Sequence, residues 1–171
     1  MKRIGIIGAG AWGTALAAAA RRAGREVCLW AFEPEVAEAV NRAHENTRYL
    51  PGVGLDPEIR ATSDLAEAGA ADALLLAMPA QRVRALCAAL IPAIGHRPPA
   101  VVCAKGIEQQ SGALMTEVVA DVVPSLPCAV LSGPTFAAEV ARELPTAVTL
   151  ACPDAGLAET LAAALRTPRF R

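Results

Sequence analysis

Gly8-Ala9-Gly10-Ala11-Trp12-Gly13 decides the fold class of this chain. The segment has the pattern Gly-x-Gly-x-x-Gly, and it stands between an apolar run, 3–7, and a helical stretch, 12–23. In that setting the first glycine permits a tight turn, the second lets the backbone approach a pyrophosphate, and the third lets helix and strand pack closely. Free N–H groups at the start of the helix attract phosphate. The motif therefore predicts dinucleotide binding, with a purely structural glycine turn as the alternative.

The sequence beyond this motif alternates short apolar runs with longer amphipathic stretches. Such alternation is typical of β-α units around a mostly parallel sheet buried on both faces. We predict strands at 3–7, 26–31, 59–62, 73–78, 100–104, 129–132 and 147–151. We predict helices at 12–23, 34–44, 64–67, 81–91, 113–122, 135–142 and 155–165. The predicted fold is a single α/β domain over 1–171, a doubly wound Rossmann-type sheet.

Residues with special backbone preferences support these boundaries. Gly24 suits a left-handed stop after the first helix, Pro34 suits a first helical turn, and the Asp154 carboxylate can cap the last helix. Residues 45–56 are rich in Asn, Pro and Gly and are predicted to form an irregular loop. At 167–171 we expect an eighth strand to begin.

The composition excludes several functional classes. The 171 residues include 16 Lys+Arg and 17 Asp+Glu, and no run of one sign would attract nucleic acid or an anionic membrane. No apolar run reaches the roughly 18 to 20 residues that cross a bilayer. We therefore expect no nucleic-acid partner and no membrane insertion.

The five cysteines are widely spaced, without a C-x-x-C pattern or a nearby histidine. This argues against a zinc site and indicates small buried side chains in a reducing cytoplasm. We predict no metal. His44 and His96 have no acid or nucleophile at motif spacing, so we predict both at the surface.

Three further predicted strands are followed by residues that could bind a ligand or take part in catalysis. They lie at the edge where doubly wound folds bind ligands. Pro79 follows 73–78, with a plain turn as the alternative. Lys105 follows 100–104 and could hold a phosphate or polarise a carbonyl oxygen; the alternative is a solvated loop lysine. Ser132-Gly133-Pro134-Thr135 leads from a strand into a helix and offers N–H groups and hydroxyls to an anion. We expect these ends to meet in one crevice.

The second predicted strand ends in Trp30-Ala31-Phe32-Glu33. In dinucleotide-binding folds an acid at this point binds the ribose 2′-hydroxyl, whereas a basic residue accommodates a 2′-phosphate. Glu33 has two alternative roles here, a ribose contact or a first-turn carboxylate that stabilises the dipole of the next helix.

Five blocks together resemble NAD(P)-dependent glycerol-3-phosphate dehydrogenases of the bacterial type. Each block alone is shared with other Rossmann enzymes, but AKGIE followed by SGPTFA is fairly specific. The blocks are GAGAWGTALA at 8–17, LW at 29–30, YLPG at 49–52, AKGIE at 104–108 and LSGPTFA at 131–137.

The resemblance implies hydride transfer between NAD(P)H and carbon 2 of dihydroxyacetone phosphate or sn-glycerol 3-phosphate, for phospholipid synthesis in the bacterial cytoplasm. It gives Lys105 a catalytic role at both cofactor and substrate, and it places Gly133 and Thr135 at the substrate. Together with the strand-end reasoning, it leads us to expect cofactor contacts from Gly8, Gly10, Ala11, Trp12, Gly13, Phe32, Glu33, Pro79, Lys105 and Ala137.

Two departures from the family pattern matter. Phe32 stands where the family often has a polar residue, and because it cannot grip a 2′-phosphate we expect NADH to bind at least as well as NADPH. The family also carries a second, helical domain with a proton-transfer lysine and basic residues for the substrate phosphate. That domain is absent from these 171 residues, so we expect nucleotide binding with negligible turnover.

Alternatives remain open at this point. The chain could be half of another Rossmann dehydrogenase with a different substrate, or an NAD-sensing module without chemistry. Apolar surface that a missing domain would cover favours association, so a homodimer is a further expectation.

Overall fold

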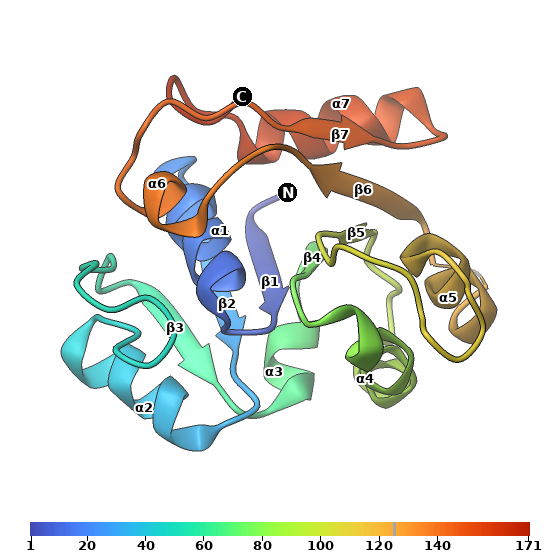
Figure 1. Ribbon diagram of the computed structural model, residues 1–171, viewed down its shortest axis with the longest axis horizontal. Coiled ribbons are helices and arrows are strands. Elements are labelled where there is room, and N and C mark those ends of the chain that lie inside the picture. Colours follow the sequence, from blue (N-terminus) through green and yellow to red (C-terminus); the bar gives the residue numbers. More distant parts are fainter. Residues whose placement is uncertain (125) are drawn as a thin grey trace.

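The computed structural model describes residues 1–124 and 126–171. Over these residues the centre of the molecule is one sheet with the strand order β3-β2-β1-β4-β5-β6-β7, drawn in Figure 1. Neighbouring strands pair in parallel up to β6, and β7 runs antiparallel to β6. The strands are β1 (Arg3–Ile7), β2 (Glu26–Trp30), β3 (Ile59–Thr62), β4 (Ala73–Leu76), β5 (Ala100–Val102), β6 (Cys128–Ser132) and β7 (Thr149–Ala151).

Helices cover both faces of this sheet, which confirms the predicted doubly wound α/β fold. One face packs against α1 (Ala11–Arg22), α2 (Pro34–Ala43), α6 (Ala137–Ala141) and α7 (Ala155–Leu165). The other packs against α3 (Leu65–Gly69), α4 (Val83–Leu90) and α5 (Met115–Val122), with short 3-10 turns η1 (Ala80–Arg82) and η2 (Ile91–Ala93) at the ends of α4. Because side chains alternate along a strand, Ile4 and Ile6 enter the first core and Ile7 enters the second.

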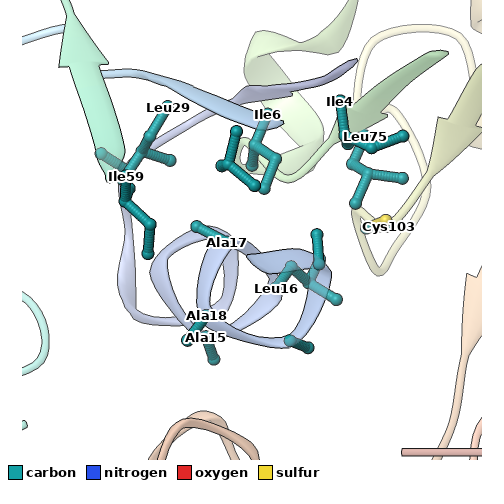
Figure 2. Packing of buried hydrophobic residues seen from close by; sticks show 14 of the residues in the cluster. Ile4, Ile6, Ala15, Leu16, Ala17, Ala18, Leu29, Ile59, Leu75 and Cys103 are labelled. Carbon is teal, nitrogen blue, oxygen red and sulfur yellow. The ribbon is translucent and has the colours of Figure 1, made fainter. Parts of the chain in front are cut away.

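Alanine makes α1 an interior helix. Figure 2 shows Leu16 and Ala17 facing Ile6 and neighbouring residues of the sheet, whereas Ala15 and Ala18 lie on the far side of the helix. That far side is also buried, because α6 packs along α1. Small side chains therefore let α1 pack closely on the sheet with one side and on α6 with the other. This close packing holds the position of the loop that precedes α1.

The predicted helix ends are confirmed where a specific residue sets them. Gly24 adopts φ 79° after α1, and Pro34 is the first residue of α2. The Asp154 carboxylate accepts a hydrogen bond of 2.9 Å from the backbone N–H of Leu157 at the start of α7.

Other boundaries were wrong by one or two residues. The predicted strands 26–31, 73–78 and 100–104 run too far, because the chain stays buried after the ladder ends. The helix predicted at 135–142 begins only at Ala137. At the chain end there is no eighth strand within the described residues, only an isolated parallel bridge between Thr146 and Phe170. His96 is exposed as predicted, but His44 is half-buried and ends α2 in a left-handed conformation, φ 52°.

All five cysteines are free thiols; Cys28, Cys87 and Cys103 are buried as predicted, whereas Cys128 and Cys152 are half-buried. Burial raises the pKa of Cys87 and of Cys128 to about 11, and it raises the pKa of Cys103 further. In the described part of the chain no three His, Cys, Asp or Glu side chains cluster as metal ligands would. No helix there is long and apolar enough to span a bilayer.

The raised pKa values of these thiols predict that the free energy of unfolding falls at alkaline pH. An unfolded chain releases thiol protons near the ordinary pKa of 9.0, whereas folded Cys87 and Cys128 keep theirs to about pH 11. The folded state then binds more protons, so each of these two thiols should lower the free energy of unfolding by on the order of 2 kcal/mol between pH 8 and pH 11. Urea unfolding at each pH measures the slope. The Cys87→Ala/Cys128→Ala variant should show a shallower slope, and an unchanged slope would contradict the prediction.

Candidate functional site

The carboxyl ends of the parallel strands meet at one edge of the sheet. Backbone hydrogen bonds continue the ladder just past the strands: Gly8 N–H donates to Trp30 O at 3.1 Å, Ala77 N–H to Ile7 O at 2.9 Å, and Cys103 N–H to Leu76 O at 3.0 Å. The glycine loop after β1 therefore lies level with the ends of β2, β4 and β5. The predicted segments after β1, β2, β4 and β5 thus share one edge of the sheet, and the crevice expected there stays a prediction.

The three glycines of the loop have separate roles. Gly8 adopts φ 118°, and a Cβ there would lie 2.9 Å from the carbonyl carbon and oxygen of Ala77. A Cβ on Gly13 would lie 1.8 Å from the carbonyl oxygen of Gly8. A Cβ on Gly10 would meet nothing within 4 Å. Gly8 and Gly13 thus allow strand and helix to pack, while Gly10 leaves open space at the loop surface, as a bound pyrophosphate requires.

The N-terminus of α1 is free to bind an anion. Gly10 is the N-cap and has no side chain to cap the helix, and the first turn holds no acidic residue. Intrahelical pairing starts with Thr14 N–H, which donates to Gly10 O at 3.0 Å. The preceding N–H groups, those of Ala11, Trp12 and Gly13, therefore lie before the hydrogen-bonded part of the helix. The geometry fits a phosphate held by N–H groups and the helix dipole.

Asn46 holds the loop over 45–56 against the glycine loop, a role that no sequence pattern indicates. Its side chain is 1% exposed. The Nδ2 group donates to the carbonyl oxygen of Ala9 and to Oγ1 of Thr14, each at 2.8 Å. Oδ1 accepts from Tyr49 N–H at 3.1 Å. The loop that was predicted only as irregular is thus hydrogen-bonded to the glycine motif through Asn46.

Phe32 and Glu33 stand at the end of β2 as predicted. The Phe32 ring is 77% exposed and meets Trp30 edge to face, with ring centroids 6.3 Å apart. Glu33 is the N-cap of α2 through its backbone, and its side chain makes no capping hydrogen bond. Instead the carboxylate accepts from Tyr49 Oη at 2.7 Å and lies 3.7 Å from the Arg48 guanidinium. Glu33 thus stands at the N-terminus of α2 without capping it through its side chain, and both the dipole role and the ribose contact stay predictions.

Lys105 bridges the ends of β5 and β6. Its ammonium is exposed and donates to the carbonyl oxygen of Gly133 at 3.0 Å. Two residues on, Thr135 Oγ1 is buried with no hydrogen-bond partner within the described residues. Lys105 thus meets Gly133 next to Thr135, and its role at cofactor and substrate stays a prediction.

Two further residues predicted to contact the cofactor are Pro79, which follows β4, and Ala137, which begins α6. Pro79 is exposed after β4 and caps η1. Ala137 is the first residue of α6 and packs against the core that surrounds α1. Their contacts with a cofactor stay predictions.

Comparison with known proteins places the chain in a family. The family described as NAD-dependent glycerol-3-phosphate dehydrogenase N-terminus matches residues 3–158. The glycerol-3-phosphate dehydrogenase (NAD(P)+) of Paramagnetospirillum magneticum is 57% identical over 171 residues, which are 100% of this chain and 62% of that relative. The protein of the same name from Parvibaculum lavamentivorans is 56% identical over 99% of this chain and 51% of its own length.

Solved structures agree. The crystal structure of glycerol-3-phosphate dehydrogenase from Coxiella burnetii has a TM-score of 0.92 at 34% identity, over 99% of this chain and 52% of that one. A UDP-glucose dehydrogenase from Pyrobaculum islandicum, with a TM-score of 0.71 at 21% identity, shares the fold alone. The chain spans about half to three fifths of these glycerol-3-phosphate dehydrogenases. It belongs to the NAD-dependent glycerol-3-phosphate dehydrogenase family and matches the N-terminal part of it.

Proposed function

We propose that this chain is the nicotinamide-nucleotide-binding part of a protein that transfers a hydride between NAD(P)H and dihydroxyacetone phosphate or sn-glycerol 3-phosphate in the cytoplasm. The observation that carries the proposal is the glycine loop, which is open at Gly10 and leads into a helix without an N-terminal cap. A pyrophosphate fits such a site because N–H groups and the positive end of the helix dipole face it together.

The remaining predicted residues follow from where a nucleotide on this loop would extend. Phe32 and Glu33 would adjoin the adenosine ribose at the end of β2, and the other half of the nucleotide would run past Pro79 toward Lys105. A nicotinamide bound there would supply the hydride. Lys105 would polarise the carbonyl oxygen or hold the substrate phosphate, with Gly133 and Thr135 beside it, since a lysine ammonium acts as a point charge for either task. Ala11, Trp12 and Ala137 would contact the nucleotide from α1 and α6.

The same geometry supports the expectation that this chain alone shows negligible turnover. Lys105 is exposed, and Phe136 next to Thr135 is 73% exposed, so the reacting groups stand in water. Orientation of the reactants and a positioned proton donor together account for much of the rate of such reactions. Exposed Phe136 and Leu144 also supply apolar surface for self-association, which supports the proposal of a homodimer.

Nucleotide titration by calorimetry tests the proposal. NADH should bind this chain, and at least as tightly as NADPH, because Phe32 offers no charge to a 2′-phosphate and the nearby Arg48 guanidinium is already 3.7 Å from the Glu33 carboxylate. In Gly10→Ala, a methyl group occupies the space of the pyrophosphate, and affinity should fall about tenfold or more, which corresponds to about 1.4 kcal/mol.

Gly95→Ala is the matched control. A Cβ on Gly95 also meets nothing within 4 Å, but this glycine follows η2 and lies outside the proposed site. Its affinity for NADH should equal that of the parent chain. Equal binding by Gly10→Ala and the parent would contradict the proposed site, and much tighter binding of NADPH would contradict the expected cofactor preference.

A further inference from the structure

The segment that follows β5 is a compact loop whose first residue is Lys105. We call residues 105–114 the Lys105 loop. It folds back on itself: Ile107 and Leu114 form an antiparallel bridge, Glu108 N–H donates to Ala113 O at 2.9 Å, and Gly112 N–H donates to Glu108 O at 2.8 Å. Gly106 adopts φ 123°, where other residues would be strained. The backbone that carries the Lys105 side chain is therefore part of one closed unit.

Apolar burial does not hold this unit in place. Its two large apolar side chains, Ile107 and Leu114, are each 54% exposed. Glu108, by contrast, is only 9% exposed although it is charged. Charged side chains are rarely buried unless they are paired, so the position of Glu108 needs a specific partner.

That partner is Arg84 on α4. Its Nε donates to Glu108 Oε1 at 2.9 Å and its Nη2 to Glu108 Oε2 at 3.0 Å, a two-point pairing of fixed geometry. Ser111 Oγ also donates to Glu108 Oε2, and Arg84 Nη1 donates to Asp121 of α5, each at 2.5 Å. Arg84, with Ser111 in second place, holds the pKa of Glu108 below its ordinary value, so the carboxylate stays charged. One arginine thus connects α4, α5 and the Lys105 loop.

Gln81 makes a second connection from η1. Its Nε2 donates to Ile107 O at 2.8 Å, and its Oε1 accepts from Gln109 N–H at 3.0 Å. Because η1 follows Pro79 at the end of β4, the loop is attached to the neighbouring strand end as well as to α4. These attachments lie on either side of Glu108 in the chain.

We propose that Arg84, Glu108 and Gln81 are positioning residues for Lys105. They hold the Lys105 loop so that the ammonium stands at the carbonyl oxygen of Gly133, 3.0 Å away. A lysine side chain has four rotatable bonds and an exposed ammonium gains little from one hydrogen bond, so its placement depends on the backbone from which it starts. The inference rests on the proposed function in that it takes Lys105 as the group that meets the substrate.

A merely structural role makes a different prediction. Apolar residues such as Val83, Cys87 and Val118 bury α4 and α5 in the core. Loss of the polar attachments should therefore release the loop without unfolding the helices. The reactivity of the Lys105 amine should change, and the structure of the rest of the molecule should not.

The chain offers an internal reference for this test, because its two lysines are Lys2 and Lys105. Lys2 lies at the amino end of β1, and its ammonium pairs with Glu26 at 2.7 Å. Acylation by an N-hydroxysuccinimide ester, followed by peptide mass spectrometry, gives a rate for each lysine in the same sample. In Arg84→Ala and in Glu108→Gln, acylation of Lys105 should rise about threefold or more, the change expected for the loss of a hydrogen bond, while Lys2 keeps its rate.

Three further variants complete the experiment. Arg82→Ala removes an exposed arginine of η1 whose side chain makes no hydrogen bond to the residues that the structure describes, and it should leave both rates unchanged. Arg84→Ala combined with Glu108→Gln should act no more strongly than either change alone, because both remove the same pairing. Gln81→Ala, which removes two uncharged hydrogen bonds at an exposed side chain, should raise the Lys105 rate without endangering the fold.

An unchanged Lys105 rate in Gln81→Ala, Arg84→Ala and Glu108→Gln would overturn the proposal. So would equal rises at Lys2 and Lys105, which would report general loosening. The measurement needs neither nucleotide nor substrate, so its outcome is separate from that of the NADH titration.

Discussion

Gly13→Ala should unfold the protein or lower its free energy of unfolding by at least about 3 kcal/mol. The added methyl carbon would lie 1.8 Å from the carbonyl oxygen of Gly8 and 3.0 Å from its carbonyl carbon. Gly8 cannot retreat, because its N–H is bonded to Trp30 O at 3.1 Å and its other side is against the backbone of Ala77. Helix α1 would have to move off the sheet, and the alanine core around it would open.

Gly10→Ala is the comparison that separates folding from binding in the same loop. Gly10 has φ −68°, which alanine adopts without strain, and its Cβ would meet nothing within 4 Å. Alanine is a poorer N-cap than glycine, so we expect a loss of about 1 kcal/mol or less. Urea unfolding followed by circular dichroism measures both variants. Similar losses in the two would show that the close approach of Gly13 to Gly8 does not limit stability.

The order of strands and helices was predictable because the sequence repeats a local pattern. Each buried parallel strand is a short apolar run, and each helix shows a wider amphipathic period. The ends of the strands were less predictable. Ala31 and Met78 are buried although they lie beyond β2 and β4, so hydrophobicity alone extends these strands too far.

Part of the candidate site was predictable for a topological reason. In a parallel sheet every strand ends at the same edge, so Gly10, Lys105 and Thr135 had to lie near one another once the strands were recognised. The polar contacts that hold the loops could not be predicted. Asn46 meets Ala9 across 37 positions and Arg84 meets Glu108 across 24, and single polar residues in irregular segments carry no periodic pattern that names a partner.

Asn46→Ala should lower the free energy of unfolding by about 2 to 4 kcal/mol. The substitution removes the donor to Ala9 O and to Thr14 Oγ1 and the acceptor of Tyr49 N–H. At this buried position, 1% exposed, no water replaces them without entering the cavity that the shorter side chain leaves. The segment over 45–56 then loses its attachment to the glycine loop, and NADH affinity should fall with stability.

Asn46→Asp sharpens this expectation, because it keeps the shape of the side chain and changes its hydrogen bonding. The new carboxylate would face the carbonyl oxygen of Ala9, an acceptor opposite an acceptor, in a site without a cation at hydrogen-bonding distance among the described residues. The loss should exceed that of Asn46→Ala, since an unpaired buried charge costs more than a cavity of this size. Asn41→Ala is the matched control: Asn41 also makes two hydrogen bonds of 2.8 Å, both to Ala61, but it is exposed, so about 1 kcal/mol is expected. Urea unfolding orders the three variants, and an Asn46→Asp variant as stable as Asn41→Ala would show that the side-chain amide of Asn46 does not hold the loop.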